Sequence, residues 1–221
     1  MSDIEQNLAT LRSELPGRVR LVAVSKTQET GRILEAYEAG QRLFGENRVQ
    51  ELVAKQSLLP GDIEWHLIGH LQTNKVKLIV PFISMIHSVD SFKLLAEISR
   101  EALKHNRIID CLLQIHIARE ETKFGMDQPE LADFLERLKR FPQPGVRIRG
   151  LMGMASFSDD TELVRREFNG IHHLFLELKD SSFSADPLFN ELSTGMSGDY
   201  RIAVEEGSTL VRIGTKLFGA R

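Results

Sequence analysis

Short runs of apolar residues alternate along the chain with segments whose apolar residues recur every three or four positions. The short runs predict strands and the longer periodic segments predict helices. A helix between two strands carries the chain back to the same edge of a sheet, so this alternation predicts parallel strands. The eight predicted strands are Arg20–Val24, Gln41–Phe44, Trp65–Ile68, Ile83–His87, Ile109–Ile115, Val146–Met152, Phe189–Leu192 and Leu210–Ile213.

Helical periodicity is clearest at Thr161–Leu178, where the apolar positions step by four and three: Val164, Phe168, Ile171, Phe175 and Leu178. Asp90 is the predicted N-cap of another helix, which continues through Leu94 and Ile98. A further helix is predicted over Glu46–Lys55, and one more precedes the first strand.

Eight strand–helix units in 221 residues leave about 28 residues for each unit, close to the minimal module of a barrel. We therefore predict α/β architecture, with a single (β/α)8 TIM barrel and an additional N-terminal helix forming one domain over residues 1–221. A doubly wound open sheet is the alternative. It is weakened because no G-x-G-x-x-G motif follows the first predicted strand.

Charge and composition exclude several classes of protein. Lys and Arg number 28 against 31 Asp and Glu, so the net charge is −3, whereas nucleic-acid binding needs a basic surface. The single cysteine, Cys111, excludes an internal disulfide, and its apolar neighbours predict a buried thiol. The N-terminus lacks the apolar core of a signal peptide, and no run approaches the roughly 20 apolar residues that span a bilayer. We expect a cytoplasmic protein with no nucleic-acid or membrane partner.

Histidines are numerous, but their spacing does not predict a metal site. His66 and His70 lie on either side of a strand end, and the adjacent His172 and His173 point in different directions on a helix. No H-E-x-x-H motif or carboxylate cluster completes a ligand set.

Chemistry in a barrel of this type collects beyond the carboxyl ends of the strands, where Lys26 follows the first one. Partial desolvation favours the neutral amine, which is the form that Schiff-base chemistry needs. A lysine at a barrel rim also extends into solvent in many proteins. Both interpretations of Lys26 remain open on this residue alone.

The ends of the seventh and eighth strands carry hydroxyls and glycines, at 193–198 and 214–215. These groups suit an anion, and the loops after these two strands form the usual phosphate site of this fold. Alternatively, Gly195 and Gly198 only make a turn before a helix. No Walker A motif is present, so a nucleoside triphosphate is not indicated.

Arg212 lies in an otherwise apolar predicted strand. A guanidinium inside a barrel needs an acceptor. A ligand nitrogen and a carboxylate of the protein both satisfy that need, and the sequence does not choose between them.

Six motifs in register along the whole chain resemble those of the pyridoxal phosphate homeostasis protein family. They are VAVSK at 22–26, FGEN at 44–47, WHLIGHLQTNK at 65–75, GLMGM at 150–154, LSTGMSGD at 192–199 and VRIGT at 211–215. The resemblance implies the barrel of the alanine racemase N-terminal domain and, as ligand, pyridoxal 5′-phosphate (PLP).

Each matching position has a role implied by the resemblance. Lys26 carries PLP as a Schiff base, and Arg212 faces the pyridine nitrogen. The other positions form the pocket, with Asn47 and Met196 at the ring and Ser193, Thr194, Gly214 and Thr215 at the phosphate. The sequence departs from the family pattern at Arg48, where an aromatic residue is expected, which affects rim contacts only.

The family regulates PLP levels, is cytosolic and often monomeric, and has no established turnover. The resemblance therefore implies a monomeric protein that sequesters PLP and delivers it, with apo forms of PLP enzymes as possible partners. Arginine stays protonated, so it leaves the pyridine nitrogen facing it unprotonated and the ring a poor electron sink. Neither of the two tyrosines, Tyr37 and Tyr200, is an evident acid–base group opposite Lys26.

Two other functions stay open at this stage. A low-activity amino-acid racemase would draw its missing proton-transfer group from His70 or from Lys123, which lies in the polar connection 118–128 and is a candidate for a mobile loop. A phosphate-binding barrel without PLP would use Lys26 only as a charge. If PLP is the ligand, Lys75 or Lys123 is predicted to assist its release, because a second amine exchanges a Schiff base.

Overall fold

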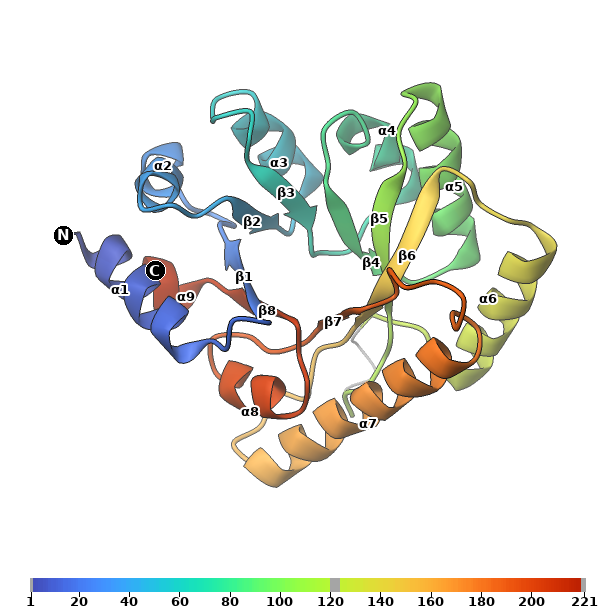
Figure 1. The fold of residues 1–221 in the computed structure, drawn as a ribbon. Coiled ribbons are helices and arrows are strands. Elements are labelled where there is room, and N and C mark those ends of the chain that lie inside the picture. Colours follow the sequence, from blue (N-terminus) through green and yellow to red (C-terminus); the bar gives the residue numbers. More distant parts are fainter. Residues whose placement is uncertain (1, 120–123, 220–221) are drawn as a thin grey trace.

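A computed structural model describes residues 2–119 and 124–219 of the chain. Its strands form a closed parallel barrel in which each strand pairs with the next one in sequence and the eighth pairs with the first (Figure 1). This arrangement confirms the predicted TIM barrel and excludes the open sheet. The strands are β1 (Arg20–Val24), β2 (Leu43–Glu46), β3 (Glu64–Leu67), β4 (Met85–Val89), β5 (Ile109–Gln114), β6 (Val146–Met152), β7 (Glu191–Ser193) and β8 (Leu210–Ile213).

Helices surround the barrel and alternate with its strands (Figure 1). They are α1 (Asp3–Glu14), α2 (Thr30–Glu38), α3 (Val49–Gln56), the 3₁₀ turn η1 (Thr73–Lys75), α4 (Val76–Ile79), α5 (Phe92–Lys104), α6 (Gln128–Arg140), α7 (Thr161–Asp180), α8 (Tyr200–Glu205) and α9 (Thr215–Phe218). The additional N-terminal helix is α1. It begins with a capping box between Ser2 and Glu5 and packs beside α2 and α9.

The apolar stripe predicted on the long helix is buried against the barrel. Helix α7 begins at Thr161, with Asp160 as its N-cap, and its buried side chains include Val164, Phe168, Ile171, Phe175 and Leu178. Side chains of the strands alternate between this outer layer and the barrel interior. Val22 and Val24 accordingly belong to a small interior cluster, whereas Ala23 packs in the large outer one.

Five predicted strands differ from the structure in their bounds, namely β2, β3, β4, β5 and β7, and the shift of β2 also moves the helix after it. The second strand runs over Leu43–Glu46 rather than Gln41–Phe44, because Gly45 and Glu46 pair with His66 and Leu67 of β3. The helix predicted from Glu46 therefore begins only at Val49.

The N-cap of α5 was also predicted one residue too early. Ser91 caps the helix, since its hydroxyl accepts a hydrogen bond from the backbone N–H of Leu94. Asp90 instead forms an ion pair with His70, 3.3 Å away.

Cys111 is buried in β5, as predicted, and burial raises the pKa of its thiol. The following connection, at 118–128, is partly described. Met126 is buried, and it exchanges backbone hydrogen bonds with residues 114 and 116. Residues 120–123, which include Lys123, lie outside the described residues.

Candidate functional site

A cavity of about 280 Å³ opens at the carboxyl-terminal mouth of the barrel. This volume is near the lower end of the roughly 300–1,000 Å³ that is usual for small-molecule sites. Its lining brings together predicted site residues that are far apart in the sequence, namely Lys26, Asn47, Met196, Arg212, Gly214 and Thr215. The sequence-based expectation that polar groups at strand ends converge is therefore met at these positions.

Lys26 lies two residues after the end of β1 and is half-buried. Apolar side chains, among them Val24, Ile68 and Met154, line the same cavity. Lys26 is therefore a primary amine in a cavity with both apolar and polar walls.

Arg212 projects from β8 into the base of this cavity and is only 4% exposed. Its guanidinium donates to the backbone oxygen of Ser193 at 2.8 Å, to the Ser193 hydroxyl at 2.6 Å and to the backbone oxygen of Gly153 at 3.0 Å. Burial lowers its pKa to about 10, so the group remains charged at neutral pH. Among the described residues Arg212 forms no ion pair, but the Asp199 carboxylate lines the same cavity and raises the pKa of Arg212 against the effect of burial.

Ser193 and Thr194 do not line the cavity. Both are buried, and the Ser193 hydroxyl lies between the Arg212 guanidinium and the ring of His87. The backbone of Thr194 pairs with Leu210, and its carbonyl accepts from Ser208. The phosphate role predicted for these two side chains stays a prediction; in this structure β7 directs Ser193 into the barrel interior.

The loop after β7 instead presents Ser197 and Gly198 to the cavity, together with Asp199. Gly195 adopts a positive φ of 85° at the turn, where an added Cβ would lie 2.6 Å from Ala203. The Asp199 carboxylate accepts a hydrogen bond from the backbone N–H of Met196 at 2.5 Å, which fixes the loop. Ser197 and Gly198 belong to the predicted motif at 192–199 but were not among the predicted site residues. The Ser-Gly pair directly after Met196 is the signal in the sequence that could have indicated them.

Asn47 carries an unsatisfied group at the wall of the cavity. Its side-chain oxygen Oδ1 is buried and has no hydrogen-bond partner among the described residues. A buried acceptor of this kind usually has a partner. Gly69 allows this placement, since a Cβ there would lie 2.3 Å from the Asn47 backbone oxygen.

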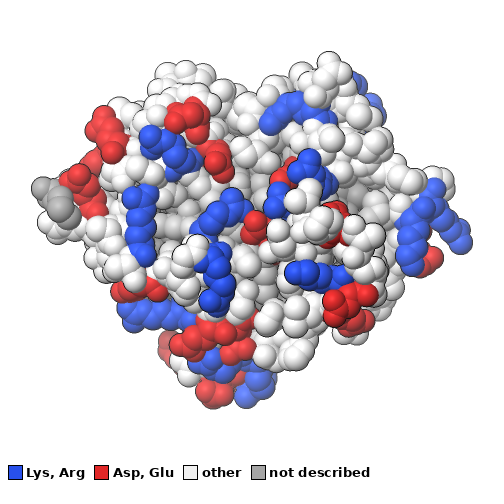
Figure 2. Space-filling view, viewed as in Figure 1, with Lys and Arg blue, Asp and Glu red and all other residues white. Residues whose placement is uncertain are grey.

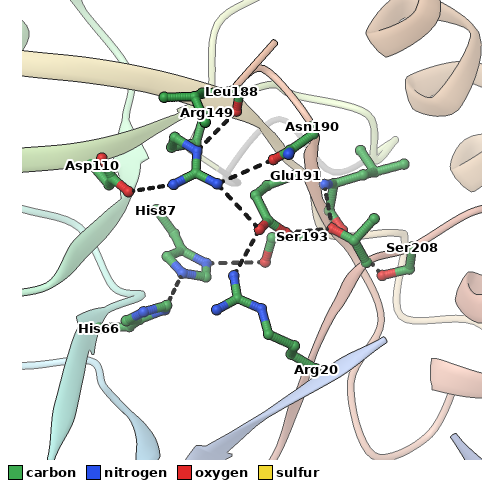
Figure 3. Close-up of polar contacts among 12 residues, drawn as sticks. Arg20, His66, His87, Asp110, Arg149, Leu188, Asn190, Glu191, Ser193 and Ser208 are labelled. Carbon is green, nitrogen blue, oxygen red and sulfur yellow. Dashed lines mark hydrogen bonds and ion pairs between the residues drawn. The ribbon is translucent and has the colours of Figure 1, made fainter. Parts of the chain in front are cut away.

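Buried polar side chains lead in series from Arg212 through Ser193 into the barrel, and Figure 3 shows the part from Ser193 to His66. The Ser193 hydroxyl lies 3.0 Å from His87 Nδ1, and His87 Nε2 lies 2.8 Å from His66 Nδ1. Ser193 accepts from Arg212, and the directions of the Ser193–His87 and His87–His66 hydrogen bonds depend on which ring nitrogen of each histidine carries the proton. The sequence analysis missed this pair, because it weighed His66 only as a metal ligand and did not consider His87.

Ion pairs close the network toward the amino-terminal end of the barrel. Arg20 binds Glu191 at 2.7 Å, and Arg149 binds Asp110 at 2.6 Å (Figure 3). The first pair joins the first residues of β1 and β7, and the second joins β5 to β6. The polar interior thus extends from the cavity to the opposite mouth.

His66 and His87 are both held in the neutral form. Burial, reinforced by Arg20, lowers the pKa of His66 to about 3, and burial together with His66 and two arginines lowers that of His87 well below its usual value. Between those values and about 6.5, unfolding takes up one proton for each histidine, so the free energy of unfolding falls with decreasing pH. Each histidine contributes a slope of about 1.4 kcal/mol per pH unit in that window.

We expect His66→Gln to remove one of these contributions. Urea unfolding measured between about pH 6 and pH 4 should lose roughly 1.4 kcal/mol per pH unit less in the variant than in the parent. His105→Gln, at an exposed histidine, is the matched control and should leave the slope unchanged. Equal slopes in His66→Gln and the parent would show that His66 is already protonated in the folded protein.

Other candidate residues lie away from the cavity. The Tyr37 hydroxyl donates to Asp62 at 2.7 Å, and that of Tyr200 donates to Glu14. His70 stacks on Phe124 with ring centres 4.4 Å apart. None of these side chains lines the cavity, nor do the exposed Arg48 and the half-buried Lys75.

The family model described as "Alanine racemase, N-terminal domain" matches residues 1–221. A pyridoxal phosphate homeostasis protein of Aquifex aeolicus is 41% identical over 91% of this chain and 87% of its own length. One from Vibrio alginolyticus is 36% identical over 100% and 99%. This chain belongs to the pyridoxal phosphate homeostasis protein family.

Solved structures of the family agree with the barrel described above. PipY of Synechococcus elongatus without PLP has a TM-score of 0.91 at 42% identity, and its PLP-bound form has a TM-score of 0.89 at 41% identity. In both comparisons the match covers 98% of this chain and 100% of PipY. Alanine racemase of Bartonella henselae shares the fold at 17% identity and a TM-score of 0.71, with 60% of its chain covered. The family resemblance read from the six motifs is confirmed.

The surface bears both signs of charge. Figure 2 shows lysine and arginine interspersed with aspartate and glutamate on the face viewed. Over the described residues, no helix is long and apolar enough to cross a membrane, and no group of three or more potential metal ligands occurs.

Proposed function

We propose that this chain binds PLP as a Schiff base on Lys26 and regulates PLP levels by sequestering and delivering it. One observation carries the proposal. A primary amine, Lys26, and a buried cation, Arg212, line the same cavity. The PLP-bound structure of PipY, at 41% identity, supports the same ligand.

The residues of the cavity fit each part of PLP. PLP supplies an aldehyde, which condenses with a primary amine and releases water. Lys26 provides that amine, and Arg212 offers a donor to the pyridine nitrogen. The Oδ1 atom of Asn47, which has no hydrogen-bond partner among the described residues, offers an acceptor at the ring edge. The exposed Met196 covers part of the ring.

The phosphate is assigned to the loop after β7 and to the start of α9. Ser197, Gly198 and Thr215 line this part of the cavity, and Gly214 is the N-cap of α9. The first turn of a helix leaves backbone N–H groups without partners inside the helix, so these groups are available to an anion. Ser193 then serves the site through Arg212, and Thr194 through the backbone of the loop.

The charge of Arg212 favours storage of PLP over catalysis with it. A protonated guanidinium keeps the facing pyridine nitrogen unprotonated, which makes the ring a poor electron sink. Racemisation also needs an acid–base group opposite the lysine, and both tyrosine hydroxyls are bound to carboxylates elsewhere. We therefore propose a carrier that is not an enzyme, acting as a cytoplasmic monomer with apo forms of PLP enzymes as recipients.

Titration of the purified protein with PLP tests this function. We expect an absorbance band near the visible edge, which disappears on borohydride reduction and leaves a pyridoxyl mark on the peptide that contains Lys26. The loaded protein should then activate an apo-enzyme. Lack of the band at excess PLP contradicts PLP binding through a Schiff base, and a band without transfer contradicts delivery.

A further inference from the structure

The backbone around Lys26 is held by charged side chains from the neighbouring β2 and α3. Lys55 Nζ donates to the backbone oxygen of Ser25 at 2.8 Å, which is the carbonyl of the peptide that joins Ser25 to Lys26. The same ammonium forms an ion pair with Glu46 at 2.7 Å. Glu46 also accepts from the Ser25 hydroxyl at 2.7 Å. The backbone carbonyl and the side-chain hydroxyl of Ser25 are therefore both held.

The residue after Lys26 is held as well. The backbone N–H of Thr27 donates to Glu51 Oε2 at 2.8 Å, and Glu51 lies 3.4 Å from Lys55. Partial burial alone raises the pKa of Glu51, but the Thr27 N–H and the Lys55 ammonium lower it overall, which favours the charged acceptor. We call Lys55, Glu46 and Glu51 the Lys55 clamp.

Thr27 needs such support because of its backbone conformation. Its φ is 62°, in the left-handed region that β-branched residues rarely adopt. Strained residues of this kind persist only where their surroundings hold them, and they gather at functional sites. The strain here lies directly beside the amine that lines the cavity.

Stability alone does not explain the clamp. Glu46 is fully buried and Lys55 is 8% exposed, and a buried ion pair is often no better for stability than apolar residues of the same size. Glu46 Oε2 is buried without a partner among the described residues, and burial raises the Glu46 pKa despite Lys55 and Ser25. This costly arrangement is directed at one short segment, Ser25–Thr27.

We propose that Lys55 is a positioning residue for Lys26, acting through Glu46 and through the peptide between Ser25 and Lys26. This inference rests on the proposed function. The clamp fixes the direction in which the Lys26 side chain leaves β1, and so sets how readily its amine reaches a bound aldehyde. Within the clamp the Lys55 charge is balanced by Glu46, and both side chains contact the Ser25–Lys26 segment directly, so the clamp acts on Lys26 through geometry.

The test compares two ligands that differ only at the reacting carbon. PLP carries an aldehyde, whereas pyridoxine 5′-phosphate carries an alcohol and cannot form an imine. In Lys55→Met, the rate at which the imine band appears with PLP should fall by about tenfold to a hundredfold, the size expected for a reacting group displaced by about 1 Å. Affinity for pyridoxine 5′-phosphate should stay within about twofold, since the clamp does not line the cavity. Lys77→Met, at an exposed lysine of α4, is the matched control.

Each outcome decides the proposal. An unchanged imine rate, or an equal loss with both ligands, overturns it, because the first denies positioning and the second indicates general damage to the pocket. If the parent binds pyridoxine 5′-phosphate but forms no imine with PLP, or binds neither, it is the proposed function that fails. Should Lys55→Met not fold, Glu51→Ala removes only the partly exposed acceptor of Thr27. If Glu51→Ala slows imine formation with PLP while its affinity for pyridoxine 5′-phosphate stays constant, the positioning role is supported. If imine formation is as fast as in the parent, the proposal is overturned.

Discussion

Lys26→Ala is expected to abolish covalent capture of PLP completely. An alanine has no amine, so no imine band should appear and borohydride should leave no pyridoxyl mark on the protein. Affinity for pyridoxine 5′-phosphate should persist, because Arg212, Asn47 and the loop after β7 are untouched. Absorbance titration with PLP and peptide mass after reduction are the measurements.

Lys75→Ala is the matched control for that variant. Lys75 lies in η1, is half-buried and does not line the cavity, so the imine band should form as in the parent. If Lys26→Ala still acquired a reducible adduct at a single site, another lysine would be the attachment point. If it also lost all affinity for pyridoxine 5′-phosphate, the lysine would act mainly as a charge, as in a phosphate-binding barrel without PLP.

Of the variants proposed for this protein, Gly150→Ala should lower the free energy of unfolding most. Gly150 pairs with Glu191 across β6 and β7 at a φ of 150°, and an added Cβ would lie 1.8 Å from the Glu191 backbone oxygen. The two strands have to separate to accept it. Overpacking and an unfavourable φ together predict a loss of about 3 kcal/mol or more, or roughly 6–12 °C in Tm for a chain of this size.

Gly170→Ala provides the opposite case within the same protein. Gly170 lies exposed in α7, and nothing lies within 4 Å of an added Cβ. Alanine should therefore stabilise the helix by about 0.5–1 kcal/mol. Thermal unfolding of both variants measures the difference, and similar Tm values would show that β6 and β7 separate at little cost.

Gly150→Ala should also weaken PLP capture, because Arg212 binds the backbone of Ser193 and Gly153 at this junction.

Local signals in the sequence predicted which segments form strands and which form helices, with errors confined to their ends. The ranges Arg20–Val24, Val146–Met152 and Leu210–Ile213 agree with the structure at both ends. Shifts occurred where pairing extends a strand past its apolar run, as at Gly45 and Glu46. A hydrogen bond to a neighbouring strand decides such boundaries, and that information is not local.

The sequence by itself determined the order of strands and helices, favoured a closed barrel over an open sheet and predicted the mouth at which the site lies. These follow from short-range periodicity and from the direction of parallel strands, which a chain carries in consecutive residues. Only the tertiary structure decided that Ser193 faces His87, 106 positions away in the chain, and that the Arg212 guanidinium binds Ser193 and Gly153. It alone placed Lys55 beneath the Lys26 peptide. Contacts of this kind depend on strand register, and a shift of one residue would reverse the direction of every side chain on the strand.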